Sequence, residues 1–157
     1  MVDWGKLLIR TDGPEIPEML GYWDWKTGPG YHPLVMSKFG DWFLADPQGK
    51  VHWLELLEGT FNCVANSVEE FEQLMVQTAK LNEWFWLPWC YKLHDDGLIP
   101  QEGQCFGFKV PPKLGAPADL SNVEVANLPA YQFWMSQIHK IPPGTVVDAI
   151  TINGKMP

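Results

Sequence analysis

The sequence predicts an α+β fold in which an antiparallel β-sheet meander packs against two or three helices. Two observations point to this class. Short apolar runs separated by turn-forming residues fill positions 33–64, which is typical of strands joined by hairpins. From residue 67 onward, longer segments place apolar residues three or four positions apart, as helices with one buried face do. The 157 residues suffice for one domain, over residues 1–157, with its own core.

An opening segment precedes the meander. Leu7–Ile9 begins a short apolar element that ends near a Gly-Pro pair. Within Glu15–Trp25, apolar residues recur at a spacing close to 3.6, which predicts one or two helical turns. Thr27-Gly-Pro-Gly30 then interrupts the chain before the first strand of the meander.

The meander itself is predicted from short apolar runs and one clear turn. Pro33–Met36 is expected to be a strand. Gly40–Asp46 and Lys50–Leu57 are expected to pair as a hairpin, because Asp46-Pro-Gln-Gly49 has Pro and Gly at the second and fourth positions of a tight turn. Thr60–Val64 adds another strand, which makes a meander of three or four strands.

A helix is predicted to begin after Ser67. Ser67 and Glu70 have the Ser-x-x-Glu spacing of a capping box, in which each side chain bonds to the free backbone N–H of the other residue. The apolar face of this helix holds Phe71, Leu74, Met75 and Thr78. Asn82–Leu93 is predicted to form a second helix, which Pro88 either kinks or limits.

The remainder of the chain is predicted to alternate strands and one helix. Strands are expected at Cys105–Val110, Val123–Val125 and Val146–Ile152. Pro129 suits the first turn of a helix. Apolar residues keep helical spacing from there to Ile141, and Pro142-Pro-Gly144 ends the helix.

The chain is acidic, with a net charge of −8 and an isoelectric point near 4.8. Residues 1–80 carry twelve acidic and six basic residues, so most of the imbalance lies in the first half. An acidic surface repels nucleic acid and attracts basic proteins. We therefore expect a basic protein partner and no direct binding of nucleic acid.

Three features favour a cytoplasmic protein. The N-terminal sequence MVDWGKLLIRTD lacks the apolar core of a secretory signal. The longest aromatic run, Trp84–Tyr91, is too short to span a bilayer, so no membrane association is expected. Cys63, Cys90 and Cys105 are odd in number and widely spaced, which fits reduced, buried thiols better than a disulfide framework.

One motif suggests nucleophilic chemistry. Gly103-Gln-Cys105-Phe-Gly107 has the spacing of a nucleophile elbow, with Cys in place of the commoner Ser. An elbow needs a strand before the nucleophile and a helix after it, whereas here a loop precedes Cys105 and Pro111-Pro112 soon follows. A structural cysteine is therefore the preferred interpretation. The alternative is a cysteine-dependent hydrolase that uses Cys105 as nucleophile and His139 as base.

The sequence also lacks the pattern of a metal site. His94-Asp95-Asp96 has oxygen and nitrogen ligands but no second ligand cluster, and neither HxxxH nor CxxC occurs in the chain. An exposed helix end explains this triplet, since a histidine in the last turn complements the helix dipole. We predict no catalytic residues, no metal and no cofactor.

Acidic and aromatic residues are interleaved around the predicted hairpin and capped helix. Such a mixture suits an interface with a basic protein, because aromatic residues anchor the contact and charges steer the encounter. A solvated acidic face is the simpler alternative. The predicted partner-binding residues are Asp41, Trp42, Asp46, Trp53, Glu55 and Glu58. In the run Trp84–Tyr91, core packing is expected, with one or two rings left exposed.

Short blocks along almost the whole chain carry a family resemblance. They are Val2–Ile9, Phe39–Leu44, Gly49–Leu54, Gly59–Phe61, Glu70-Phe71, Phe108–Pro111, Leu114-Gly115, Asn122–Glu124, Gln137–His139 and Pro142–Thr145. In order and spacing they resemble a bacterial family of short cytoplasmic proteins, known either as a domain of unknown function or as type VI secretion immunity proteins with a GAD-like relationship. Where that family usually has a second Gly after Leu114-Gly115, this chain has Ala116.

The resemblance implies an α+β fold and a protein that binds and neutralises a cognate secreted toxin, often a nuclease. A nuclease carries positive charge to hold DNA, so an acidic inhibitor is able to occupy the same surface. Beside the hydrolase, a non-catalytic ligand-binding or scaffold domain is the third hypothesis. The toxin, the docking face and the oligomeric state are left open by the sequence.

Overall fold

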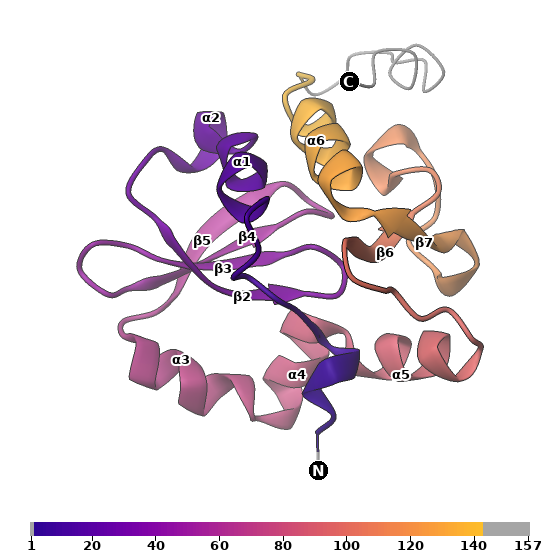
Figure 1. The fold of residues 1–157 in the computed structure, drawn as a ribbon, viewed down its shortest axis with the longest axis horizontal. Helices are drawn as coiled ribbons and strands as arrows, with labels where there is room; N and C mark the ends of the chain where they lie inside the picture. Colours follow the sequence, from indigo (N-terminus) through magenta and orange to yellow (C-terminus); the bar gives the residue numbers. More distant parts are fainter. Residues whose placement is uncertain (1, 143–157) are drawn as a thin grey trace.

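The computed structural model describes residues 2–142, and its centre is a five-stranded antiparallel sheet with helices on both faces (Figure 1). The strands follow one another in space as they do in sequence, which confirms the predicted meander and the α+β class. They are β1 (Leu8–Ile9), β2 (His32–Ser37), β3 (Trp42–Ala45), β4 (Val51–Glu55) and β5 (Thr60–Ala65).

The β3–β4 hairpin forms around the predicted turn. The amide of Gly49 donates to the carbonyl of Asp46 over 2.9 Å, and the Asp46 carboxylate accepts from the amides of Gln48 and Lys50. Gly49 has a φ of 86°, a left-handed conformation that glycine adopts without steric cost. The resulting register pairs Phe43 with Trp53.

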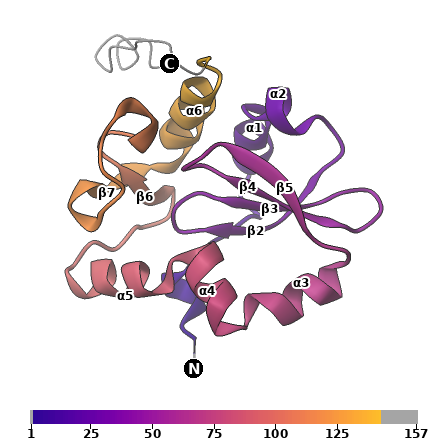
Figure 2. The same cartoon turned by 180° about the vertical axis from the view of Figure 1, so that it is seen from behind.

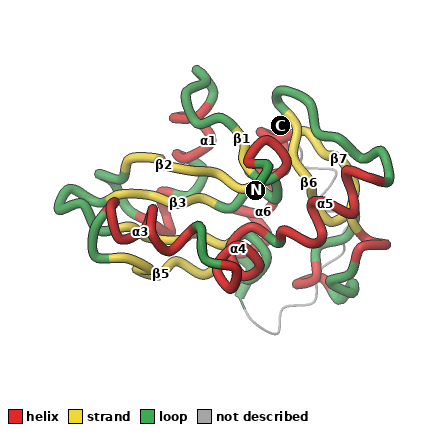
Figure 3. Tube along the Cα trace, turned by 90° about the horizontal axis from the view of Figure 1, so that it is seen from below, coloured by secondary structure: helices red, strands yellow, loops and turns green. Residues whose placement is uncertain are grey.

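Three consecutive helices follow the sheet: the first two lie against one of its faces and the third continues past its edge, as the views from behind and from below show (Figures 2 and 3). They are α3 (Val68–Met75), α4 (Thr78–Phe85) and α5 (Leu87–Asp95). The hydroxyl of Ser67 accepts from the amide of Glu70 over 3.0 Å, so the predicted helix start is confirmed. This cap satisfies one of the free amides of the first turn.

The predicted helix Asn82–Leu93 is wrong in its bounds, because the structure contains two helices that meet at Trp86. Trp86 has φ 51° and ψ 49°, the left-handed conformation, and it belongs to the ends of both helices. Pro88 lies in the first turn of α5. A proline ring inside a continuous helix would collide with the carbonyl four residues earlier, so Pro88 limits the second helix.

The opposite face of the sheet is covered by helices from both ends of the described chain. They are α1 (Ile16–Gly21), α2 (Asp24–Thr27) and α6 (Leu128–His139). A two-stranded sheet of β6 (Gln104–Phe108) and β7 (Val123–Asn127) precedes α6. Single 3-10 turns occur at Trp4–Lys6, Pro112–Leu114 and Leu120–Asn122. The predicted strand Val146–Ile152 lies outside the described residues.

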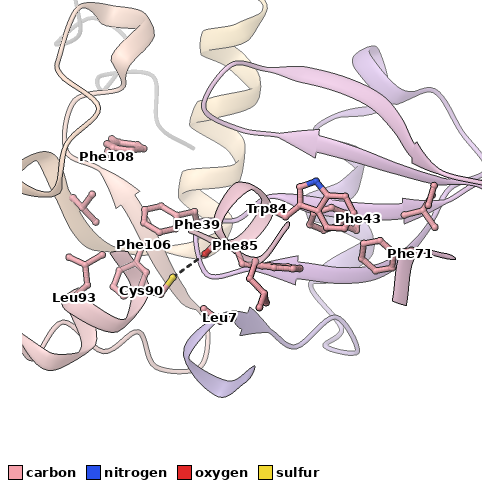
Figure 4. Close-up of a cluster of buried hydrophobic side chains, with 14 residues drawn as sticks. Leu7, Phe39, Phe43, Phe71, Trp84, Phe85, Cys90, Leu93, Phe106 and Phe108 are labelled. Atoms are coloured by element: carbon pink, nitrogen blue, oxygen red, sulfur yellow. Dashed lines mark hydrogen bonds between the residues drawn. The ribbon is translucent and has the colours of Figure 1, made fainter. Parts of the chain in front are cut away.

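Aromatic rings fill the space between the sheet and α3–α5 (Figure 4). The Phe43 ring from β3 lies 5.1 Å from that of Phe71 in α3 and 5.2 Å from that of Trp84 in α4. The Phe85 ring in α4 lies 5.5 Å from the Phe43 ring. All four side chains are at most 1% exposed, so this face is stabilised by apolar burial and ring contacts.

A buried glutamine organises the other face. The side-chain oxygen of Gln132 in α6 accepts from the indole N–H groups of Trp23 and Trp42, at 2.8 and 2.9 Å. Its amide nitrogen donates to the carbonyl of Gly40 over 2.8 Å. Gly40 has a φ of 87°, and a Cβ there would lie only 2.9 Å from that nitrogen. We call this set, Trp23, Gly40, Trp42 and Gln132, the glutamine hub.

Candidate partner-binding surface

Two of the six predicted contact residues are buried. Asp41 is 3% exposed and Trp42 is 0% exposed, because helices cover both faces of the sheet. One Asp41 carboxylate oxygen accepts from the amide of Leu56 over 2.8 Å, and the Trp42 indole belongs to the glutamine hub. The structure therefore does not place Asp41 and Trp42 for direct contact with a partner, contrary to the prediction from the sequence.

Burial makes Asp41 an unusual carboxylate. Loss of hydration raises its pKa to about 7, and the hydrogen bond from the Leu56 amide opposes that rise. Asp41 lines a very small cavity, together with Phe39, Leu57 and Trp86 among others. A group of this kind contributes a pH dependence to stability.

Asp46 is engaged by its own hairpin. Its carboxylate lies 2.9 Å from the imidazole of His52, and both side chains are largely buried, at 13% and 17% exposure. The hydrogen bond with His52 lowers the pKa of Asp46. The rings of Tyr31 and Phe61 contact the imidazole at 5.2 and 5.4 Å. His52 is thus half-buried among aromatic rings.

Trp53 is half-buried and lies in β4, two positions before Glu55. Its ring is parallel to that of Phe43, 5.9 Å away. Its indole N–H is buried and has no hydrogen-bond partner within the described part of the chain. Trp53 and Glu55 are two positions apart in β4, so both side chains lie on the face that α3 and α4 cover.

Glu55 and Glu58 reach the solvent, as residues that contact a partner must. Glu58 is exposed and Glu55 is half-buried. Burial raises the pKa of Glu55, and the negative charges of Glu58 and Glu83 raise it further. Glu83 comes from α4 and was not among the predicted residues. The acidic group therefore joins the β4–β5 turn to α4, which sequence spacing alone does not reveal.

An open groove of about 490 Å³ adjoins these acidic residues. It is lined by Leu57, Asn82, Trp86, Pro88, Trp89 and Ala118, and we call it the Trp86–Trp89 groove. Leu57 and Asn82 are the chain neighbours of Glu58 and Glu83. The Trp86 and Trp89 rings are half-buried, so the aromatic run contributes to the surface as well as to the core.

The motif around Cys105 does not have the geometry of a nucleophile elbow. Cys105 lies inside β6 and is 0% exposed, and burial raises the pKa of its thiol. The His139 imidazole contacts the carbonyl of Leu56, and burial lowers the pKa of that imidazole. An activated thiol needs access and a stabilised thiolate, and Cys105 has neither.

Metal ligands do not cluster in the described region. Within residues 2–142, no group of three or more His, Cys, Asp or Glu side chains converges to hold a metal ion. His94 lies in the last turn of α5, and Asp96 follows the helix and pairs with Lys92 over 3.0 Å. The helices of the same region include none long and apolar enough to cross a membrane.

The segment that forms most of the groove matches a known family. Residues 65–139 match the model described as T6SS immunity protein Tdi1, C-terminal. The match supports a type VI secretion immunity family. No curated protein matches the chain. The match supports an immunity protein that neutralises a toxin, and the family suggests a non-catalytic role.

The matched segment runs from the end of β5 to the end of α6. It includes Glu83, Trp86 and Trp89, whereas Glu55 and Glu58 precede it. The surface that joins these residues is therefore built partly from the family segment and partly from the hairpin before it.

Proposed function

We propose that this protein is a cytoplasmic immunity protein that binds a cognate basic toxin and blocks it, with a nuclease as the toxin class. The observation that carries this proposal is the family match over residues 65–139, since an immunity family implies a toxin partner. The acidic balance of the chain supports the choice of a basic partner, because opposite charge speeds encounter and favours correct docking.

The contact surface we propose is acidic with an apolar floor. Of the predicted residues, Glu55 and Glu58 make direct contacts and Trp53 packs beneath them. Asp46 holds the turn at the opposite end of the β3–β4 hairpin from Glu55 and Glu58, so we assign it no contact on this surface. A nuclease holds DNA with positive charge, so an acidic protein on that surface competes with the substrate.

Co-expression tests this proposal. The toxin encoded beside the gene of this chain is induced in bacteria with and without the chain, and survival is measured. We expect the chain to restore growth and to elute with the toxin as one complex. Affinity is expected to weaken as salt concentration rises, because salt screens exposed charges. If no neighbouring gene product is neutralised or bound, the proposal is wrong.

A further inference from the structure

The Trp86–Trp89 groove has a rigid aromatic floor. The two indoles meet edge to face, with ring centres 4.9 Å apart and planes at 83°. Trp86 also packs on Phe39 at 4.7 Å, which fixes its orientation from the core side. Pro88, between them, is exposed. Interface energy is concentrated in preformed aromatic sites of this kind, since little conformational entropy is lost on binding.

The backbone conformation of Trp86 also indicates that this residue has a special role. Among the described residues, Trp86 is the one non-glycine with a positive φ. The left-handed conformation is sterically unfavourable for a residue with a Cβ, and glycine or asparagine adopts it more readily. The chain nevertheless has tryptophan at this position, so an indole ring lies at the junction of α4 and α5.

Negative charge flanks the groove. Glu58 follows the lining residue Leu57 in the chain, Glu83 follows the lining residue Asn82, and both carboxylates are close enough to Glu55 to raise its pKa. Lys80 is one neighbouring cation, and its ammonium is bound to Glu83 over 2.9 Å and lies over the Trp84 ring. Glu55, Glu58 and Glu83 outnumber this lysine on the α4 side of the groove.

We propose that this groove and its acidic rim are the docking site for a basic segment of the toxin that packs an apolar side chain against the surface formed by Trp86, Pro88 and Trp89. The inference rests on the proposed function and names its contact site. Charge complementarity selects the occupant, since the net charge of −8 on each chain opposes a second copy at an acidic rim.

Three variants of the full chain test the site by calorimetric titration with an inactive form of the toxin encoded beside its gene. P88E places a charge in the apolar centre at an exposed position, so it leaves the core intact. W89A removes one wall, and E58K/E83K reverses the rim. We expect each variant to raise the Kd about 100-fold, as loss of an interface hot spot does.

Matched controls carry the same chemical changes on the opposite side of the sheet. E18K/D24K changes two exposed acids in α1 and α2, so it reproduces the change in net charge. W25A removes a tryptophan that is 42% exposed in α2. Both controls should bind within about threefold of the unmodified chain, because residues outside an interface change affinity little. Circular dichroism verifies that every variant is folded.

The outcomes separate the groove from the function. If P88E, W89A and E58K/E83K all bind the toxin with the affinity of the unmodified chain, the proposed docking groove is wrong and the proposed immunity function is unaffected. If, of the three groove variants, E58K/E83K alone loses affinity and the control E18K/D24K loses as much, the attraction is general electrostatics, which also overturns the groove proposal. Absence of binding by the unmodified chain overturns both proposals. A dimer of the chain that P88E disperses would show that a second copy occupies the groove.

Discussion

The two faces of the central sheet both bury apolar side chains but differ in the polar contacts that they bury. Between the sheet and α3–α5, buried rings such as Phe43, Phe71 and Trp84 pack at centre distances of 5.1–5.5 Å. On the other face, Gln132 makes three hydrogen bonds that connect α6 to the chain near Trp23 and to the turn before β3. Both faces bury an apolar core, and the second face adds a buried glutamine whose hydrogen bonds join α6 to the sheet.

This difference predicts that the two kinds of contact respond differently to substitution. Apolar packing loses stability in proportion to the volume removed, and neighbouring rings relax around a change. A buried hydrogen-bonding group has no such freedom, because each donor or acceptor left without a partner costs free energy in full. A substitution among the buried rings of Phe43, Phe71 and Trp84 is thus expected to be tolerated better than one at the glutamine hub, which holds the sheet and α6 in register.

The largest effect is expected from breaking the glutamine hub. Q132L leaves two indole donors and the Gly40 carbonyl unpaired inside the core. We expect a loss of about 5 kcal/mol in the free energy of unfolding, since each unsatisfied buried group costs roughly 1–3 kcal/mol. Urea unfolding measures it. S136A is the control: it removes a buried hydroxyl of α6 that bonds only within the helix. Equal losses in both variants would contradict the special role of Gln132.

A somewhat smaller loss is expected on the aromatic face. F71A removes a ring that is 1% exposed and contacts Phe43 and Trp84. We expect a loss of about 4 kcal/mol, within the range for a buried Phe→Ala change. F71L, which fills most of the space, should recover more than half of it. If F71L is as unstable as F71A, this face is less adaptable than we infer.

Asp41 connects the two faces, and its effect depends on pH. The folded state raises its pKa to about 7, so the folded chain holds a proton that the unfolded chain releases near pH 4. Stability from this group is complete below pH 4 and is lost as pH rises towards 7. D41N keeps an oxygen for the Leu56 amide and does not ionise.

We therefore expect the advantage of D41N over the unmodified chain to grow by about 2–4 kcal/mol between pH 4 and pH 8. Thermal and urea unfolding across this range measure the difference. Subtracting the unmodified chain at each pH removes the opposite contribution of His139, whose pKa is lowered by burial. A difference that is constant with pH would show that Asp41 ionises normally.

The smallest effect is expected at the start of α3. S67A removes the hydroxyl that accepts from the Glu70 amide. We expect a loss of about 1 kcal/mol, the usual cost of an N-cap. S67D restores an acceptor at the same position and should return stability to within about 0.5 kcal/mol of the original. Failure of S67D to recover stability would mean that the serine acts through something other than capping.

Local chemistry in the sequence determined where the elements begin and turn. Asp46-Pro-Gln-Gly49 formed the predicted turn, Ser67 capped the predicted helix, and Pro129 lies in the first turn of α6. The reason is that turns and caps are made by residues within four positions of one another. The meander followed from the short connections between its strands.

Only the tertiary structure decided which surfaces are available. Trp42 and Phe43 are neighbours on opposite faces of β3, and both are 0% exposed because helices cover both faces. Strand alternation assigns residues to two faces but does not show which face water reaches. The glutamine hub joins residues more than 90 positions apart, and the groove joins the β4–β5 turn to α4 and α5. Contacts between residues so far apart along the chain exist only once it is folded.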